Sequence, residues 1–498
     1  MARTASGILL PGLNVDAVGQ EPMTAQLFNA LRQQIKEGAI NPSIRMPSTR
    51  TLASDLGISR TTVANAYDQL KSEGYLVGRE KSGTFVTDVL PQSLSRHANI
   101  SLGLTHAEAD LGAPLADRFE DNPLKPRERT SRTLPFNPGI PAVSEFPAQA
   151  WSRLLRPIVS QLAPSGIARC PAEGAIELRE QVANYLANSR GVVCSTDQIL
   201  IVSGTRQALL LILLGLSNPG DFGWTEDPGY PGTAVSYNLF RVKPVPVPVD
   251  EDGLIVQDGI RLKRDAKFAY VTPARQAPLG HTMTIKRRVE LLNWAHDTGG
   301  YILEDDYDGE YRFGGHPSPS LQSLDPDGRV FYFGTFSKTI LPSLGIGYLV
   351  VPRRYIETFR SLLDAVSRPP SLATQLTTAE FIATGAFESH IRKMRSLYIR
   401  RQNALSRVLK AELGPLLDTH VLNAGLHLLG YLQNGQDDRV VATKARSLGL
   451  SPRPLSDYTI NAKIRSGLLI GFSNISEEGM PRAAKTLRRA ILETPLVS

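Results

Sequence analysis

The chain has 498 residues, of which 42% are hydrophobic and 21% are charged, and its net charge is +7. These values are typical of a soluble globular protein, and the chain is too long for one ordinary core, so we expect two or three domains. A positive charge of this size permits a nucleic-acid partner but is common among soluble proteins.

The sequence shows no targeting or membrane signal. Its start has no charged region followed by an apolar run, and the longest apolar run, residues 208–216, is about half of the roughly 20 residues that span a membrane. The two cysteines, Cys170 and Cys194, show neither metal-ligand spacing nor a disulfide pattern. We therefore expect a cytoplasmic protein with no membrane contact and no metal site.

Three zones follow one another along the chain. Residues 1–88 alternate short helical patterns with turns. Residues 89–134 lack periodicity and contain four prolines and a basic cluster, which is the composition of a linker. In residues 135–498, short apolar strands alternate with amphipathic helices, and this pattern predicts an α/β domain with a mostly parallel sheet.

The N-terminal zone carries the pattern of a helix-turn-helix. Apolar residues at helical spacing predict a first helix, and they are Met23, Leu27, Ala30, Leu31 and Ile35. Ser48 is a good N-cap for a short second helix, which Gly57 can end in the left-handed conformation. Ser59 caps a third helix, and Gly74 closes it. Two helices joined by a tight glycine turn make the motif.

The third helix and the segment after it predict a surface that reads DNA. The core face of this helix is formed by Val63, Ala66, Tyr67 and Leu70. Away from that face lie Thr61 and Asn65, with Arg60 in the first turn, where such motifs meet bases and phosphates. Residues 75–77 and 84–86 have the pattern of two strands joined by a basic wing at 79–83. The alternative is a small helical bundle with solvated arginines.

These segments resemble the GntR family of winged-helix regulators. The resemblance rests on three segments, MPSTRTLA at 46–53, GISRTTV at 57–63 and LKSEGYL at 70–76. It implies that Arg50 and Arg60 hold phosphates or a guanine edge, because arginine offers paired donors. The residues that we expect to contact DNA are Ser48, Arg50, Ser59, Arg60, Thr61, Thr62, Asn65, Ser82 and Gly83.

The C-terminal zone places functional candidates at the ends of several predicted strands. The segment 201–205 leads into a long apolar helix, whose free amide groups near Thr205 can hold a phosphate. The segment 224–231 ends a strand with Tyr230, a ring that can stack on a flat ligand or simply pack. Another predicted strand end precedes Arg275. In open α/β sheets, ligands bind outside the carboxyl ends of the strands.

An acidic run follows the predicted strand at 301–304. A carboxylate such as Asp305 beside a pyridine nitrogen keeps that nitrogen protonated, and a nearby tyrosine such as Tyr307 can donate to the ring hydroxyl. The alternatives are a solvated acidic turn and a metal loop. A metal loop should bring further ligands, and no histidine cluster is near in the sequence.

The strongest signal is FYFGTFSK at 331–338, in which a strand runs into a turn with two hydroxyls and a lysine. A lysine that holds pyridoxal 5'-phosphate (PLP) needs a rigid strand end, hydroxyl donors for the phosphate and a buried, nucleophilic amine. Thr335, Ser337 and Lys338 fit these roles. A lone lysine after a strand is usually only solvated, so the prediction depends on the other segments.

Together these segments resemble a fold-type I aminotransferase, and with the winged helix in front the chain resembles the MocR-type branch of the GntR family. The expected fold class is multidomain, with a mostly α winged helix-turn-helix followed by an α/β fold-type I domain that has a mostly parallel sheet. The resemblance implies a homodimer, and paired readers imply a double-stranded DNA operator with two half-sites.

The same resemblance implies roles for the candidates in the C-terminal zone. Lys338 would bind PLP through a Schiff base, Tyr230 would stack on the ring, and Asp305 would meet the pyridine nitrogen. The phosphate would be surrounded by Thr205, Thr335 and Ser337.

The chain departs from the family pattern around the phosphate. Seven residues beyond the lysine, the family usually has an arginine that grips the phosphate, and this chain has Gly345. A usual tyrosine further upstream is missing near Ala168. Arginines appear instead at two strand ends, Arg206 and Arg275. Our hypothesis is that one of them replaces the missing guanidinium, and the alternative is that PLP binding is weakened or lost.

The expected effector is a small amine, an amino acid or PLP itself. A carboxylate-bearing amine needs an arginine near the lysine, and Arg453 is a candidate that can equally be an ordinary surface residue. We expect a PLP-dependent transcription regulator that uses the aminotransferase fold as a sensor and not as an enzyme. The alternatives are an active aminotransferase with a DNA-binding module and a regulator whose sensor binds no PLP.

Overall fold

The structure is a computed structural model, and it describes residue 15 and residues 21–79, 82–88, 134–162, 164, 170–314 and 318–496. The chain divides into two compact units, residues 1–113 and 114–498. The boundary between the units falls inside the linker predicted at 89–134, but only residue 134 of that linker is among the described residues. The limits of the linker therefore stay a prediction.

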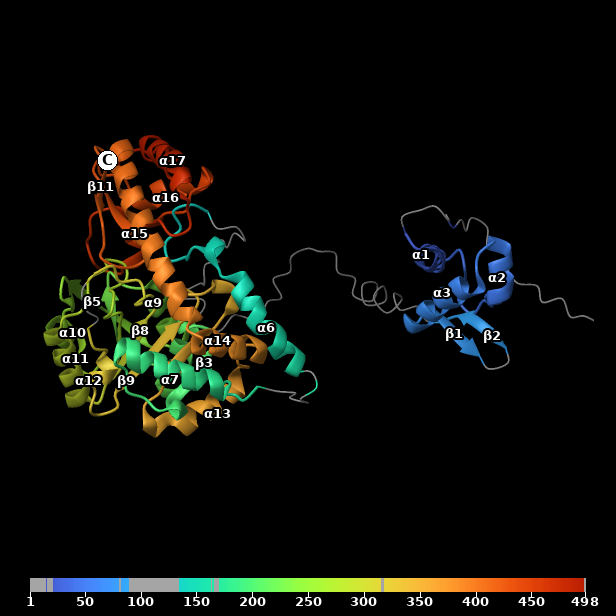
Figure 1. The fold of residues 1–498 in the computed structure, drawn as a ribbon, viewed down its shortest axis with the longest axis horizontal. Coiled ribbons are helices and arrows are strands. Elements are labelled where there is room, and N and C mark those ends of the chain that lie inside the picture. The colour runs from blue at the N-terminus through green and yellow to red at the C-terminus, as the bar shows by residue number, and fades with distance from the viewer. Residues whose placement is uncertain are drawn as a thin grey trace, which may run out of the picture. The chain divides into compact units, whose positions relative to one another are not determined.

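In its described part, the first unit contains three helices and a two-stranded sheet (Figure 1). The elements are α1 (Met23–Lys36), α2 (Thr49–Leu56), α3 (Arg60–Ser72), β1 (Leu76–Arg79) and β2 (Gly83–Val86). The two strands are antiparallel, with Leu76 opposite Val86 and Arg79 opposite Gly83. This order of elements is that of a winged helix-turn-helix, as predicted.

Local hydrogen bonds explain where α2 and α3 begin and end. The side-chain oxygen of Ser48 accepts a hydrogen bond from the backbone N–H of Thr51, at 3.1 Å, and Ser59 does the same for Thr62, at 3.1 Å. Each bond satisfies an N–H group that has no partner inside the helix. Gly57 ends α2 with φ +65°, a conformation that favours glycine. The predicted caps are therefore confirmed.

The core of the first unit lies between its helices. The predicted core face of α3 is buried, and so are three of the five residues predicted for α1; Met23 and Ala30 are half-buried, and Phe28 is buried in addition. The hydroxyl of the buried Tyr67 donates to the carbonyl of Pro47, at 3.0 Å. This bond ties α3 to the loop before α2, so the helix that is predicted to read DNA has a fixed position within its unit.

The second unit is built on an eight-stranded sheet with the order β3-β10-β9-β8-β7-β4-β5-β6. The strands are β3 (Ile199–Val202), β4 (Phe222–Asp227), β5 (Lys243–Asp250), β6 (Gly253–Leu254), β7 (Phe268–Val271), β8 (Tyr301–Asp306), β9 (Val330–Thr335) and β10 (Gly347–Val350). Neighbouring strands from β9 through β8, β7 and β4 to β5 are parallel, whereas β10 is antiparallel to both of its neighbours. The predicted mostly parallel sheet is confirmed.

The parallel arrangement brings the predicted strand ends to one edge of the sheet. Because β10 is antiparallel to both β3 and β9, β3 runs in the direction of β9, so the chain leaves β3, β4, β7, β8 and β9 on the same side. β8 extends two residues beyond the predicted end at Glu304, because Asp305 and Asp306 pair with Phe333 and Gly334 of β9. The carboxylate of Asp305 therefore projects from a regular strand and not from a loop.

Helices cover both faces of this sheet (Figure 1). Phe331 and Phe333 of β9 pack in the core that contains α8 and α13, whereas Tyr332 between them belongs to the core with α7, α14 and α15. The helices of this unit up to α14 are α6 (Ala148–Leu162), α7 (Ile176–Arg190), α8 (Thr205–Leu216), α9 (Pro231–Leu239), α10 (Val256–Lys263), α11 (Ile285–Thr298), α12 (Leu321–Leu324), α13 (Ile356–Val366) and α14 (Leu372–Ala383). Burial on both faces explains the nearly continuous apolar runs of these strands.

A smaller lobe follows at the C-terminal end of the unit. Its antiparallel sheet has the order β11-β12-β14-β13, with β11 (Leu417–His420), β12 (His427–Leu432), β13 (Arg453–Pro454) and β14 (Gly467–Gly471). It packs with α15 (Ala386–Leu413), α16 (Asp438–Ser447) and α17 (Met480–Leu492), shown in orange and red in Figure 1. Short 3₁₀ helices lie at Val143–Glu145, Thr196–Gln198, Pro342–Leu344, Arg353–Tyr355, Leu455–Tyr458 and Glu477–Gly479. In the described residues, no helix is long and apolar enough to cross a bilayer.

Candidate functional site

A cavity of about 180 Å³ lies around Lys338 in the second unit. The structure brings seven of the nine predicted cofactor-binding residues to its wall, namely Thr205, Tyr230, Arg275, Asp305, Tyr307, Thr335 and Lys338. They follow different strands, and the wall is completed by residues of the smaller lobe, including His427 and Leu469. The cavity therefore lies where the sequence predicted a ligand, outside the carboxyl ends of the parallel strands.

Lys338 lies three residues beyond the end of β9, and its Nζ donates a hydrogen bond to the carbonyl of Gly139. Burial lowers the pKa of this amine, and the nearby carboxylates of Asp308 and Asp305 oppose the shift. Gly139 has φ +73°, and a Cβ added to it would lie 2.6 Å from Nζ. The positive φ favours glycine at this position, and a side chain here would displace the lysine amine from the Gly139 carbonyl.

The carboxyl group of Asp305 is buried, with one oxygen bonded and one oxygen free. Its Oδ2 accepts a hydrogen bond from the Tyr270 hydroxyl, at 2.6 Å, while Oδ1 is buried and has no hydrogen-bond partner among the described residues. Burial raises the pKa of Asp305 to about 8. A buried acceptor without a donor destabilises the folded protein. A ligand that donates an N–H group to Oδ1 would therefore bind favourably there.

Arg275 is the centre of a buried polar cluster on the cavity wall. Its Nη1 lies 2.9 Å from Oδ2 of Asp308 and donates to the Tyr307 hydroxyl at 2.8 Å. Its Nε donates to the carbonyl of Ala424 at 3.2 Å, and Nη2 lies 3.2 Å from Nε2 of His427. The side chain of Arg275 is 2% exposed. All three guanidinium nitrogens therefore have a partner within the protein.

The start of α8 forms another part of the wall. Thr205 is the first residue of the helix, and a Cβ added to Gly204 before it would make an ordinary contact with Oγ1 of Thr335, at 3.9 Å. The first N–H groups of a helix have no helical partner and favour anions. Arg206, the next residue, is exposed and donates from Nη2 to the Tyr230 hydroxyl at 3.3 Å.

Buried acidic residues hold the strand ends around the cavity. Asp227, at the end of β4, accepts hydrogen bonds from three consecutive backbone N–H groups at 460–462, with distances of 2.8 to 2.9 Å. This carboxylate ties the smaller lobe to the large sheet beside Tyr458, which lines the cavity. Asp306 pairs with Arg190 at 2.6 Å and accepts from the Tyr332 hydroxyl at 2.6 Å. These contacts position the backbone that carries the site.

In the first unit, the predicted DNA-contacting residues lie in exposed positions. Eight of the nine are exposed, namely Ser48, Arg50, Ser59, Arg60, Thr61, Asn65, Ser82 and Gly83. Thr62 is half-buried, and its hydroxyl is within 2.8 Å of the Ser59 hydroxyl. The wing residues Glu80 and Lys81 lie outside the described residues. The remaining set presents arginines, hydroxyls and an amide without large apolar side chains, which suits a DNA surface.

Comparison with known proteins identifies both units. A family model for bacterial regulatory proteins of the gntR family matches residues 23–86, and a model for class I and II aminotransferases matches residues 149–427. The probable rhizopine catabolism regulatory protein MocR of Rhizobium meliloti is 36% identical over 482 residues, with 96% of each chain covered. The HTH-type pyridoxine biosynthesis regulator PdxR of Corynebacterium glutamicum is 31% identical, with 91% of this chain and 92% of that chain covered.

The chain belongs to the MocR-type group of the GntR family. Among solved structures, a kynurenine aminotransferase of Pyrococcus horikoshii matches with a TM-score of 0.66 and 27% identity, covering 73% of this chain and 92% of that chain. This MocR-type protein is therefore a helix-turn-helix transcription regulator with an aminotransferase-like domain. The cofactor of that domain is PLP. The predicted resemblance, fold class and cofactor are confirmed.

The residues of the cavity fit PLP at three chemical groups. The buried amine of Lys338 suits the carbonyl carbon, the free Oδ1 of Asp305 suits the protonated ring nitrogen, and the first amides of α8 with Thr205 and Thr335 suit the phosphate. The unpaired Oδ1 is the most specific of these features, because it lacks the donor that a pyridinium N–H supplies.

The structure describes part of the phosphate end that the sequence singled out, and the expected departure from the family pattern there stays a prediction. Gly345 has φ +58° and open space around its Cβ position, so the backbone there suits glycine, whereas an arginine would be strained. Ser337 and Arg206 are not among the residues that line the cavity, and neither is Arg453, which is half-buried on β13 opposite Leu469. Ala168 lies outside the described residues.

The sequence did not single out several residues of the wall. They are Gly139, Tyr270, Thr272, Asp308, His427 and Tyr458. Asp308 belongs to the acidic run at 305–308, and Tyr270 and Thr272 flank the end of β7. Their position at strand ends could therefore have identified these three as residues of the cavity wall. Gly139 and His427 are distant in sequence from every strand end of the large sheet, and only the packing of the smaller lobe brings them in.

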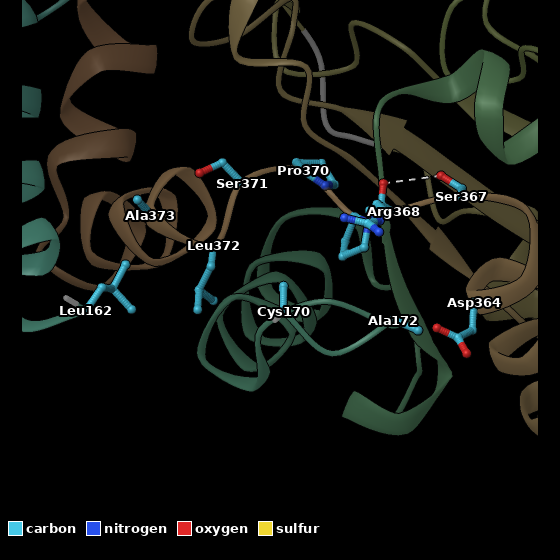
Figure 2. Close-up of a pocket in the computed structure, with 11 residues that line it drawn as sticks. Leu162, Cys170, Ala172, Asp364, Ser367, Arg368, Pro370, Ser371, Leu372 and Ala373 are labelled. Atoms are coloured by element: carbon cyan, nitrogen blue, oxygen red, sulfur yellow. Dashed lines mark hydrogen bonds between the residues drawn. The ribbon is translucent and has the colours of Figure 1, made fainter. Parts of the chain in front are cut away.

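A second cavity, of about 560 Å³, lies between the end of α6 and the segment that joins α13 to α14 (Figure 2). Its lining includes Cys170, Asp364 and Arg368, and the Ser367 hydroxyl donates to the Arg368 carbonyl at 3.2 Å. None of the predicted cofactor residues lines it. It is larger than the cavity around Lys338, but the described residues that line it include no comparable set of buried polar groups, so size does not identify the chemical site here.

Proposed function

We propose that this protein senses a small amine with the PLP site around Lys338 and converts that event into a change in DNA binding by its winged helix. The observation that carries the proposal is the cavity that holds the Lys338 amine together with Asp305, whose Oδ1 has no hydrogen-bond partner among the described residues. When bound, PLP supplies an aldehyde carbon that bonds to primary amines and a ring that withdraws electrons.

The protein's own groups have distinct tasks in this site. Gly139 orients the Lys338 amine, and burial keeps a larger fraction of that amine unprotonated and nucleophilic than in water. Asp305 holds the ring nitrogen. Arg275 donates to the Tyr307 oxygen, which leaves the Tyr307 proton free to point at the ring hydroxyl. Tyr230 is assigned to stacking on the ring.

The phosphate is assigned to the start of α8, with Thr205, Thr335 and Ser337 around it. Of the two arginines that the sequence offered as a replacement guanidinium, Arg206 has the better support. It is exposed at the second position of α8, whereas Arg275 is buried and bonded through all three nitrogens. An arginine at this helix end adds to the dipole that already favours an anion.

On the DNA side, we assign Arg50 and Arg60 to phosphates or a guanine edge and Thr61 and Asn65 to base edges. Ser48, Ser59 and Thr62 lie beside them, and Ser82 and Gly83 form the wing. The domain limits that go with this function are 1–88 for the reader, 89–134 for the linker and 135–498 for the sensor. The active form is a cytoplasmic homodimer on an operator with two half-sites, because paired readers require paired sites.

An absorbance titration of the purified full-length protein tests the proposal. Wild-type protein with added PLP should show a band of lysine-bound cofactor that small amines change, and Lys338→Ala should lack that band. Operator affinity, measured by fluorescence anisotropy on the same samples, should change only in those samples in which the amine changes the absorbance band. A wild-type protein without such a band contradicts the proposal and favours a regulator whose sensor works without PLP.

The set of Lys338, Asp305 and Tyr307 is also what amino-group transfer requires, so an active aminotransferase is the second candidate. Transfer of the amino group to a keto acid at rates comparable to ordinary enzymes would favour it. The sensor function requires only that the effector has different affinities for the two states of the regulator.

A further inference from the structure

The charged groups of the cavity form a short, balanced set. Among the described residues that line it, the ionisable side chains of opposite sign are Lys338 and Arg275 against Asp305 and Asp308. His427 also lines the cavity, but burial and the neighbouring Arg275 hold its pKa well below its usual range, so its ring is uncharged at neutral pH. The other lining side chains are apolar or carry hydroxyl groups.

The proposed function accounts for two of these charges. In that proposal, Lys338 binds the carbonyl carbon of PLP and Asp305 pairs with the ring nitrogen. The remaining pair is Arg275 and Asp308, which lie 2.9 Å apart and are both almost completely buried. The pair neutralises itself, so no cation on the described wall is left for a carboxylate.

This balance selects against acidic effectors. Transfer of a carboxylate from water to a buried site is strongly unfavourable unless a cation or several hydrogen-bond donors meet it. Arg275 cannot turn to meet one without breaking bonds to Asp308, Tyr307 and the Ala424 carbonyl. Arg206 and Arg453 do not line the cavity, and Arg206 is assigned to the phosphate.

The same wall offers an acceptor to a different kind of ligand. Within the described part of the chain, Oδ1 of Asp308 is buried and has no hydrogen-bond partner, although Oδ2 of the same group accepts a hydrogen bond from Arg275. Asp308 is 3% exposed and lines the cavity. A hydroxyl or amino group of the effector would supply the missing donor, and bonds to charged acceptors are the stronger ones.

We infer that the effector of this regulator is a primary amine that carries a hydroxyl or a second amino group and no carboxylate. The inference rests on the proposed function, because it takes the PLP site at Lys338 as the place where the amine is recognised. It narrows the expected effectors from amines and amino acids in general to amino alcohols and diamines.

Matched probes test it on the full-length protein loaded with PLP. Ethanolamine and serine differ only by the α-carboxylate, ethanolamine and propylamine differ by a hydroxyl in place of a methyl, and 2- and 4-aminobutyrate add a carboxylate to propylamine at either end. The measurement is the probe concentration at which the absorbance band of bound PLP shows half of its maximal change. Each value is divided by the corresponding value for free PLP, which removes differences in the reactivity of the amines.

We expect ethanolamine to act at concentrations at least about tenfold lower than serine, and propylamine to lie between ethanolamine and the aminobutyrates. Carboxylated probes that act as well as their matched amines overturn the inference while leaving the proposed function intact. A band that no probe changes also overturns it. A protein that shows no band with PLP overturns the proposed function itself, so the two failures are distinguishable.

The Asp308→Asn variant makes the charge of the cavity wall more positive. It leaves the Arg275 charge without a counter-charge, so the advantage of ethanolamine over serine should shrink severalfold. Glu304→Gln is the matched control, because Glu304 is a buried acid of β8 that lies 3.7 Å from Arg288 and does not line the cavity. The control should keep the wild-type ratio; a loss of the ratio in both variants would contradict the assignment to Asp308. The wild-type ratios decide the inference if either variant fails to hold PLP.

Discussion

The residues predicted to contact DNA lie between Ser48 and Gly83, are mostly exposed, and are placed by bonds to neighbours a few residues away. The residues around Lys338 extend along the chain from Pro138 to Leu469, are mostly buried, and hold one another through contacts between distant segments. The first surface can meet a large partner without rearranging. The second must compensate each buried charge, so its chemistry is set by which polar groups remain unpaired.

The largest effect that separates the two regions should come from Lys338. Lys338→Ala removes the amine that we propose to hold PLP, so the band of lysine-bound cofactor and its response to amines should both disappear. Absorbance spectra with saturating PLP measure this. A remaining band in the variant would show that another lysine is the attachment point and that the cavity has been assigned wrongly.

The next effect concerns the exposed region. Arg60→Ala should weaken operator binding about tenfold, and the slope of log affinity against log salt should fall by about one if Arg60 meets a phosphate. Fluorescence anisotropy at several salt concentrations gives both values. Arg353→Ala, which removes an arginine from the second unit, is the control and should change neither. An unchanged affinity for Arg60→Ala would remove this residue from the DNA surface.

Asp305→Asn should lower PLP affinity about tenfold or more, because a neutral amide pairs less strongly with a protonated ring nitrogen. Equilibrium dialysis or fluorescence titration with PLP measures the change. Wild-type affinity in the variant would mean that the free Oδ1 of Asp305 is not the partner of the ring.

In the protein without PLP, the same substitution should change how the free energy of unfolding depends on pH. Burial raises the pKa of Asp305 from its ordinary value of 3.8 to about 8, so the folded chain holds a proton that the unfolded chain releases in that window. The free energy of unfolding therefore falls as pH rises through it. Asp305→Asn should reduce this fall, which denaturant unfolding at several pH values measures. A steeper fall in the variant would contradict the assigned direction.

The smallest expected effects come from replacing a glycine with positive φ in each of the two regions. Gly57 and Gly345 both have positive φ, +65° and +58°, and open space at the Cβ position. Alanine at either site should destabilise its own unit by about 1 kcal/mol through backbone strain alone. Thermal unfolding of the full-length variants, followed by proteolysis to separate the units, measures this. A much larger loss for Gly345→Ala would reveal packing demands at the phosphate end.

Much of the fold could be predicted from the sequence because its signals are local. Ser48, Gly57 and Ser59 mark helix ends through bonds that span three residues, and the buried strands are short apolar runs. The end of β8 was placed two residues too early, because acidic residues rarely lie inside a strand unless tertiary partners compensate them. Tyr270 and Arg190 are those partners for Asp305 and Asp306.

The sequence by itself determined the two-part organisation and the family, and it singled out Lys338 as the candidate for the lysine that binds PLP, since each depends on residue types at fixed spacing. Tertiary structure alone decided which oxygens of Asp305 and Asp308 stay unpaired, that Arg275 is neutralised by Asp308, and that Gly139 and His427 complete the cavity. The physical reason is that the cost of a buried charge depends on neighbours from distant segments, and no sequence spacing records which of them come within hydrogen-bond distance.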